Sequence, residues 1–414
     1  MILLLLYLGL FLVAFLGVRV IRHRRGRRDL TSLKTVTFGD ESAVVPDRAA
    51  SVISVLAVFL IWGAFTGSTW VPLHVPGPYV GPVSFAYTMQ DATGASAQGQ
   101  VDVQVYRVGR EPKKVPPAPA AGFAPNLTAT VAAWRSVLIR VPAPEGAKVV
   151  SVDGRPAAVD QVVPVPHGTV SLTARGSLNF VPDPGMQMEP IWLPPPEAVV
   201  ARFFEIARNG FQNVSLWQHV SASLVRVLAG FALGSLVGIP LGYAMGLSGW
   251  VRGWFDPIVE FMRPVPPLAL IPLVIIWFGI WETGKIVLLF LAALWIMVIA
   301  ARAGVSGVRI SKIHAAYSLG ASKWQILRHV IIPNSLPDLF TGARVAMGVC
   351  WGTVVAAELV AAEKGAGMMI IVASKFQMTD VVVMGIILIG VIGYGIDILM
   401  RLAERHLVPW KGRG

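Results

Sequence analysis

Gly279, Gly284 and Lys285 have the spacing that comes closest to a known catalytic motif in this sequence. A phosphate-binding loop follows the pattern G-x-x-x-x-G-K with Ser or Thr, because that hydroxyl holds Mg²⁺, and it joins a strand to a helix. Here Ile286 follows the lysine, and apolar runs lie on both sides. We therefore exclude a nucleotide site. Neither a metal-ligand cluster nor a serine elbow occurs elsewhere, so we predict no catalytic residues, no metal and no cofactor bound by this chain.

Glu358 is a different kind of candidate, because it is a carboxylate within an apolar run. A charge inside a membrane span must face a partner or a water-filled cavity, which makes Glu358 a candidate for a translocation path. A second candidate is a gate formed by Arg263 and the nearby prolines Pro264, Pro266 and Pro267, which interrupt the start of a helix. The alternative interpretation is that the arginines near span ends reach to the membrane interface: Arg226, Arg263 and Arg344.

Long apolar runs must position these residues. Of the 414 residues, 55% are hydrophobic and only 14% are charged, and the mean hydropathy is +0.65. This composition excludes a disordered chain and disfavours an ordinary soluble domain. Seven runs approach the roughly 20 residues that cross a bilayer: Ile2–Val18, Ala49–Phe65, Leu224–Met245, Val265–Ile280, Ile286–Ala303, Leu339–Val360 and Val381–Met400. We predict an all-α polytopic membrane protein with about seven transmembrane helices.

The positive charge indicates how these helices are oriented. The chain carries a net charge of +12, and basic residues collect in alternate connections between the runs. Arginines follow the first run directly: Arg19, Arg22, Arg24, Arg25, Arg27 and Arg28. Because short cytoplasmic loops hold the excess of Lys and Arg, we expect the N-terminus outside and the C-terminus in the cytoplasm. Topology accounts for the charge, so we predict no nucleic-acid partner.

A polar region interrupts the apolar pattern. Residues 70–193 are rich in Pro and Gly, with alternating strand patterns at Val101–Val105 and Thr169–Ala174 and a strand with a tight turn at Val149–Gly154. An extended break is expected at Pro112–Pro119. We predict five parts: an anchor (1–20), a basic cytoplasmic segment (21–48), a second transmembrane helix (49–68), an inserted external β-rich domain (70–193) and a core (194–414). The core opens with an amphipathic helix from Pro196 that stops at Gly210.

A glycine recurs at every fourth residue of the third run: Gly230, Gly234, Gly238, Gly242 and Gly246. This spacing places all five on one helix face and allows the backbone of another helix to approach closely. We predict a packing role for them.

The cytoplasmic loop 302–337 is too polar to span a membrane. It is expected to form two short helices, Ile313–Leu319 and Ser322–Ile332, with a turn at Gly320 and an end at Pro333. Ala315 and Ala316 permit close contact with a partner surface, and Ala321 and Trp324 follow the turn. A solvated amphipathic loop is the alternative interpretation.

These residues resemble a known motif. His314-Ala315-Ala316, three residues, Gly320, nine residues and then Val330 to Pro333 are similar to the EAA loop of type I ABC importer permeases, with histidine in place of the usual glutamate. Further segments are similar to the nitrate, sulfonate and taurine branch of these permeases: Arg263–Ala269, Pro272-Leu273, Trp277–Ile280 with Glu282, Ala357-Glu358, Gly365–Gly367, Arg401-Leu402 and Val408–Trp410. The resemblance covers about Leu193 to Gly414.

The resemblance implies a multi-pass permease of the bacterial inner membrane with the type I importer fold. It implies that the loop docks on a separate ATPase dimer, which binds the ATP and Mg, and that an external solute-binding protein and a second permease copy complete the complex. The solute would be a small anion such as a sulfonate, taurine or nitrate. A rival hypothesis is a membrane-anchored binding or adaptor module in which the external insert recognises a ligand or a partner protein.

Overall fold

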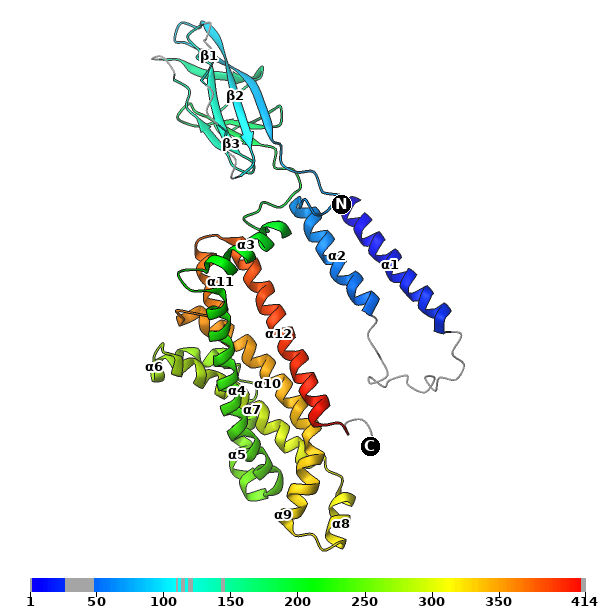
Figure 1. Ribbon diagram of the computed structural model, residues 1–414. Coiled ribbons are helices and arrows are strands. Elements are labelled where there is room, and N and C mark those ends of the chain that lie inside the picture. Colours follow the sequence, from blue (N-terminus) through cyan, green and yellow to red (C-terminus); the bar gives the residue numbers. More distant parts are fainter. Residues whose placement is uncertain are drawn as a thin grey trace. The chain divides into compact units, whose positions relative to one another are not determined.

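The computed structural model describes residues 2–26, 48–108, 111–112, 116–117, 122–142 and 146–410 (Figure 1). It divides into two compact units, Met1–Glu197 and Ala198–Gly414. The predicted segment 21–48, the break at Pro112–Pro119 and the end of the chain lie wholly or partly outside the described residues. The helices are α1 (Ile2–Gly26), α2 (Arg48–Thr66), α3 (Pro196–Asn209), α4 (Leu216–Leu247), α5 (Gly249–Met262), α6 (Ile271–Phe278), α7 (Glu282–Ser306), α8 (Ile310–Ser318), α9 (Lys323–Ile326), α10 (Ile332–Ala361), α11 (Ala366–Lys375) and α12 (Thr379–Leu407).

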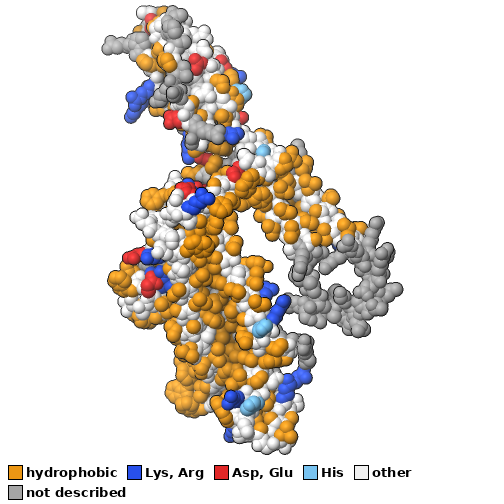
Figure 2. All heavy atoms as spheres, in the orientation of Figure 1, with side chains coloured by type: hydrophobic (Ala, Val, Ile, Leu, Met, Phe, Trp, Pro, Cys, Tyr) orange, Lys and Arg blue, Asp and Glu red, His pale blue; other side chains and the backbone are white. Residues whose placement is uncertain are grey.

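Five described helices are long and apolar enough to cross a membrane: Ala49–Thr66, Leu216–Leu247, Glu282–Ser306, Lys323–Leu359 and Thr379–Leu407. They contain five of the seven predicted spans, which are thereby confirmed as helices. In α1, the part Leu5–Ile21 is apolar but shorter. Figure 2 shows hydrophobic side chains over most of the visible face of the helices, with Lys and Arg near the end that carries α8 and α9.

The predicted span Val265–Ile280 is wrong as a single helix. Helix α5 stops at Met262, a 3-10 turn covers Pro267–Leu270, and α6 runs for only 8 residues. Helix α5 and the segment Pro267–Phe278 are bent by 92° relative to each other, and together they have the length and composition of one span. The cause is the run of prolines, because each lacks a backbone N–H and its ring clashes with the preceding turn of a helix. If this bent pair counts as one span, six parts of the described chain are long and apolar enough to cross a membrane.

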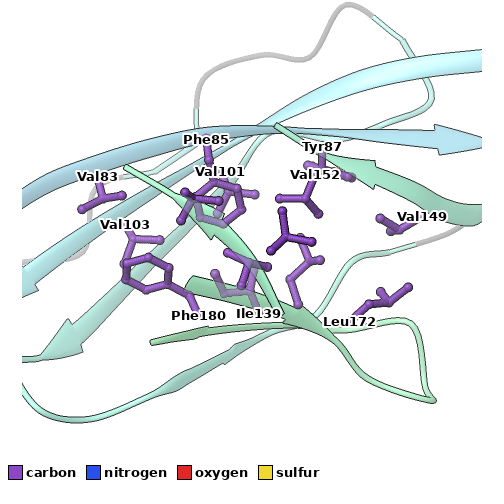
Figure 3. Close-up of a cluster of buried hydrophobic side chains, with 14 of the residues drawn as sticks. Val83, Phe85, Tyr87, Val101, Val103, Ile139, Val149, Val152, Leu172 and Phe180 are labelled. Carbon is purple, nitrogen blue, oxygen red and sulfur yellow. The ribbon is translucent and has the colours of Figure 1, made fainter. Parts of the chain in front are cut away.

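The strands form two sheets in the first unit. Their bounds are β1 (Gly81–Gln90), β2 (Ser96–Tyr106), β3 (Leu127–Ala132), β4 (Val137–Ile139), β5 (Lys148–Val152), β6 (Arg155–Pro156), β7 (Val162–Val165), β8 (Gly168–Leu172) and β9 (Leu178–Pro182). The orders are β3-β2-β1-β5-β6 and β4-β9-β8-β7. Alternate residues of both sheets are buried in one apolar core, where Phe85 stacks on Phe180 with ring centroids 5.9 Å apart (Figure 3). Burial also raises the pKa of Tyr87 to about 12.

The predicted strands are present in this sandwich. Val101–Val105 lies in β2, and the turn after β5 has positive φ at both Asp153 (50°) and Gly154 (75°), the geometry of a tight hairpin. The strand predicted at Thr169–Ala174 ends earlier, at Leu172, because Thr173 begins a turn in which its carbonyl accepts from Gly176.

Backbone hydrogen bonds join the two chain segments that connect the sandwich to α2 and α3. Tyr79 N donates to Asp183 O (3.1 Å), Met186 N to Pro76 O (2.8 Å) and Met188 N to Phe65 O (2.9 Å). These segments therefore form a hydrogen-bonded pair rather than two independent linkers.

Glu197, the last residue of the first unit, contacts the residues that follow α2. Its carboxylate accepts from Ser68 Oγ (2.6 Å) and from Thr69 N (2.9 Å). Burial raises the pKa of Glu197, but these hydrogen bonds outweigh it and hold the pKa below its usual value.

The five glycines of α4 pack against α7. An added Cβ at Gly234 would lie 2.6 Å from Ala293 Cβ, and one at Gly242 would lie 2.4 Å from Val298 O. Equivalent close approaches occur at Gly230, Gly238 and Gly246. Because real Cβ atoms do not approach backbone atoms so closely, the two helices can lie together only while this face has no side chains.

Replacing Gly242 by Ala should lower the thermal unfolding midpoint of the purified chain, with an expected cost of about 1–3 kcal/mol from overpacking. The matched control is Gly348→Ala on α10, where an added Cβ meets nothing within 4 Å. That variant should match or exceed the parent, because Ala favours a helix over Gly. Equal behaviour of the two variants would contradict the proposed packing.

Candidate functional site

A buried cluster of polar groups lies where α4, α7, α10 and α11 meet. We call it the Arg226 cluster; its members are His219, Ser223 and Arg226 on α4, Glu282 on α7, Glu358 on α10 and the backbone of Gly365–Gly367. Exposed fractions are 0% for His219 and Ser223, 5% for Arg226 and 1% for Glu358. Buried polar groups are costly unless each has a partner, so the contacts decide what this cluster does.

Helix α4 presents the first three members on one face. His219, Ser223 and Arg226 follow each other at helical spacing, and the same face continues into the glycine stripe. The helix starts at a capping box, in which Ser215 Oγ accepts from Gln218 N and Gln218 Oε1 accepts from Ser215 N (3.2 and 3.1 Å). This cap fixes the first turn of α4, and His219 lies in that turn.

Glu358 is the acceptor at the centre of the cluster. Its carboxylate accepts from Ser223 Oγ (2.8 Å), from Arg226 Nη1 (2.6 Å) and from the backbone N–H of Gly367 (2.9 Å). Gly365 has φ 148°, and an added Cβ there would lie 2.3 Å from Glu358 Cδ. The carboxylate therefore holds the turn that leads into α11.

Arg226 joins this turn to the start of α7. Its Nε and Nη2 donate to Glu282 (2.5 and 2.7 Å), and its Nη1 donates to the carbonyl of Lys364 (2.7 Å) as well as to Glu358. Lys285 Nζ adds a contact to Glu282 at 3.0 Å. One guanidinium thus fastens three helices.

The N-terminus of α11 is held by the same cluster. Gly365 N donates to His219 Nδ1 (3.2 Å), and Ala366 N donates to Ser223 Oγ (3.0 Å). These N–H groups would otherwise have no partner within the helix. The short helix α11 is therefore fixed at its start by side chains of α4.

An open hollow lies beside the cluster, lined by Gln218, Ser221, Ala222, Val225, Arg226, Glu282, Ile286, Glu363 and Lys364. Its charged groups have both signs, and Arg226 already uses most of its donors within the protein. Among the residues that the structure describes, no group of three or more His, Cys, Asp or Glu side chains is placed to hold a metal ion.

The structure does not bring the predicted gate residues together with Glu358. Arg263 pairs with Glu260 (3.7 Å), and Pro264, Pro266 and Pro267 lie in and just before the turn between α5 and α6. Glu358 faces the protein interior, where it holds the turn before α11, and its part in a translocation path stays a prediction.

The main functional residue that the sequence pattern does not reveal is Arg226, for which it predicts only an arginine reaching to the membrane interface. A signal was available in the sequence. Ser223 and Arg226 continue the spacing of Gly230 and Gly234 toward the start of the helix, so they had to share the buried face.

Helices α8 and α9 form a hairpin at the other end of α7. Gly320 has φ 78°, as expected for the turn between them, and Ser322 and Gln325 form a capping box that starts α9. Ile313 and Ala316 of α8 and Ala321 pack against the buried residues Ile326 and Ile331. This apolar contact holds the hairpin closed.

The prediction that the second helix ends at Pro333 is wrong. A π-helical turn covers Leu327–Ile331, and α10 starts at Ile332 with Pro333 in its first turn. The proline is tolerated here because the preceding turn is widened: Ile332 N donates to Leu327 O, five residues earlier, and not to the residue four earlier. The π-turn changes the hydrogen-bond pattern just before the proline, so the chain continues directly from α9 into α10.

The beginning of the predicted loop 302–337 also differs. Helix α7 continues to Ser306, so Arg302 lies in the helix. Its guanidinium forms ion pairs with Asp256 and Glu260, both on α5, and Arg302 Nη2 lies 3.0 Å from Glu260 Oε1. The hairpin is therefore shorter than the predicted loop and starts from a fixed end of α7.

The hairpin presents an exposed surface at its tip. His314, Ala315, Leu319 and Trp324 are exposed, Leu319 by 88% and Trp324 by 66%. Ala316 is only partly exposed because it packs inside the hairpin. The two alanines of the motif thus have different environments, with Ala315 outward and Ala316 inward. Exposed, large apolar side chains such as this leucine and tryptophan are the kind of groups found at protein interfaces.

Replacing Arg226 by Ala should strongly destabilise the chain, by about 3–5 kcal/mol, because it leaves the buried Glu358 carboxylate without its cation. Thermal unfolding of the detergent-purified protein measures this. The double variant Arg226→Ala/Glu358→Ala should lose less than the sum of the two single variants. Additive losses would show that the two groups do not act as a pair.

Comparisons with known proteins identify the helical part. Residues 234–409 match the family described as "Binding-protein-dependent transport system inner membrane component". The taurine transport system permease protein of Escherichia coli is 48% identical over 226 residues, which are 54% of this chain and 82% of that protein. A putative aliphatic sulfonates transport permease protein of the same organism is 39% identical over 219 residues, 53% of this chain and 82% of that protein.

A bicarbonate transport system permease protein of Synechococcus elongatus is 31% identical over 202 residues, which are 49% of this chain and 72% of that protein. The match to the family confirms the resemblance drawn from the loop motif. The chain belongs to the family of binding-protein-dependent transport system inner membrane components, the permease subunits of ABC transporters.

Proposed function

We propose that this permease, paired with a second copy of itself, forms the translocation path for a small sulfonate such as taurine. The observation that carries the proposal is the 48% identity with a taurine permease, against 31% with a bicarbonate permease. The solute is delivered by an external binding protein, and a separate ATPase dimer, which binds ATP and Mg, supplies the energy by hydrolysing the ATP.

The proposed topology places the N-terminus outside and the C-terminus in the cytoplasm. It counts α1 as the first of seven spans and the bent pair of α5 and α6 as the fourth. The support is the distribution of charge: Arg309, Lys312, Lys323 and Arg328 lie on or beside the hairpin, so that end of the helical unit faces the cytoplasm.

The hairpin of α8 and α9 is the proposed contact to the ATPase. Leu319 and Trp324 offer the apolar surface, and Ala315 next to His314 leaves room for a close approach. The hairpin is continuous with α10 through the π-turn, and Tyr243 on α4 hydrogen-bonds Ser335 on α10 (2.5 Å). A displacement of the hairpin is therefore transmitted directly to two membrane helices.

Replacing Leu319 by Asp should abolish co-purification of the ATPase subunit and reduce taurine uptake at least tenfold, because a charge would be buried in the contact. The thermal midpoint should stay unchanged, since Leu319 has almost no contact within the chain. Ala316→Asp should lower the midpoint as well, because Ala316 packs inside the hairpin.

The matched control is Phe376→Asp, an equally drastic change at an exposed apolar residue after α11 (69% exposed), which should keep the ATPase bound. If Leu319→Asp retains both the ATPase and uptake, the coupling role is refuted. Uptake of bicarbonate or nitrate in place of taurine by the parent protein would refute the proposed substrate.

For the β-sandwich we propose an accessory role outside the membrane, in docking the solute-binding protein. The two segments at its base support this, because they are hydrogen-bonded to each other and are not two independent linkers. The rival hypothesis makes the sandwich the ligand-recognising part and the helices a scaffold.

Deleting residues 82–182 and joining the ends should separate these roles, since Tyr79 N and Asp183 O lie 3.1 Å apart and a short link can close the gap. We expect the shortened permease to fold and to transport taurine at saturating binding protein, with a several-fold higher concentration of binding protein needed for half-maximal uptake. If the shortened permease needs the same concentration of binding protein for half-maximal uptake as the parent, the docking role is excluded.

A further inference from the structure

A cavity lies between the C-terminal part of α12 and the facing side of α10. It is lined by Arg344, Arg401, Glu404, Arg405, Val408 and Pro409. Three guanidinium groups thus surround one carboxylate. Nothing in the proposed transport mechanism uses this cavity.

Two of the three arginines are partly neutralised. Arg344 donates from Nε and Nη2 to Asp397 Oδ1 (3.2 and 3.1 Å), and its Nη1 lies 3.7 Å from Glu404. Arg401 donates from Nε to Asp397 Oδ2 (2.8 Å). Among the described residues, the terminal nitrogens of Arg401 and the whole guanidinium of Arg405 have no hydrogen-bond or ion-pair partner. These free donors give the cavity an excess of positive charge.

The cavity lies where α12 leaves the apolar region. Residues 381–396 carry no charge and rise about 24 Å along the helix. Asp397 is the first charged residue after this run, and Arg401 and Arg405 follow one and two turns later. The lipid headgroup region begins at the edge of the hydrocarbon core, so both free guanidinium groups lie at headgroup depth.

An apolar stripe on the same helix face leads from these arginines toward the centre of the membrane. Ile398, Tyr394, Val391 and Ile387 point within about 40° of the direction of Arg405 at 100° per residue. They are 47%, 67%, 63% and 44% exposed. The stripe is about 16 Å long, which matches the depth of one leaflet of a hydrocarbon core about 30 Å thick.

We propose that this face of α12 binds an anionic phospholipid, with its phosphate on Arg401 and Arg405 and its acyl chains along the stripe from Ile398 to Ile387. The phosphate oxygens accept from the free guanidinium N–H groups, and the cavity beside Arg344 receives the rest of the headgroup. Charge and apolar contact are arranged in the order in which a phospholipid presents them. In the topology proposed above, the lipid belongs to the cytoplasmic leaflet.

The test measures retention of added phosphatidylglycerol and phosphatidylcholine by the full chain in detergent, by native mass spectrometry. We expect the chain to retain phosphatidylglycerol in preference to phosphatidylcholine. Arg405→Gln breaks no hydrogen bond among the described residues and should weaken phosphatidylglycerol binding about fivefold, and Arg401→Gln/Arg405→Gln at least tenfold. The matched control is Arg252→Gln on α5, whose side chain is exposed to the same extent (56% against 57% for Arg401) and whose loss should have no effect.

Three outcomes would overturn the proposal. Equal retention of phosphatidylcholine would remove the role of the lipid charge. Competition by inorganic phosphate or taurine at the concentrations that saturate phosphatidylglycerol would show a site for a free oxyanion. A disulfide between Tyr394→Cys and a cysteine placed on another protein segment or second copy would show that protein covers the stripe; the native Cys350 is buried and does not interfere.

Discussion

The close contact of α4 with α7 is the interaction on which the rest of the helical unit depends. Association of helices in a membrane gains little from the hydrophobic effect, because lipid is as apolar as the helix surface. Packing and polar contacts must supply the specificity. The glycine face of α4 allows its backbone to contact Ala293 and Val298 directly, and no other residue type would leave this space.

The same face of α4 carries its members of the Arg226 cluster, which lie N-terminal to the glycines. Once α4 and α7 are in contact, Arg226 lies within reach of Glu282 on one side and Glu358 on the other. Burying Arg226 or Glu358 alone would be prohibitive, but the two form an ion pair, and the N–H groups of the turn before α11 and the more exposed Glu282 complete their contacts. The cluster therefore converts the helix contact into a fixed position for α11.

Sequence patterns predicted the parts of this fold that depend on local composition. Long apolar runs gave five of the spans, and alternation gave the strands of the sandwich, because both patterns follow directly from which faces are buried. The motif from His314 to Pro333, together with further segments of the core in the same order, indicates the family, which the comparisons confirm. The glycine spacing indicated a close helix contact but not that α7 is the partner.

The failures have a common physical origin in long-range geometry. The prolines before α6 broke a run that hydropathy alone treats as one span. Pro333 was expected to end a helix, but the π-turn before it accommodates the ring. A carboxylate in an apolar run, such as Glu358, needs a partner or a water-filled cavity. The partner in the structure is Arg226, on a helix more than a hundred residues away, which local patterns do not reveal.

The central claim is that the exposed tip of the hairpin is a protein contact to a separate ATPase. The most direct measurement is the rate at which a water-soluble maleimide labels Ala315→Cys, in the isolated permease and in the complex with the ATPase. The native Cys350 is buried, so the introduced cysteine is the one that reacts. We predict rapid labelling of the isolated chain and at least tenfold slower labelling in the complex. Equal rates in both would contradict the account.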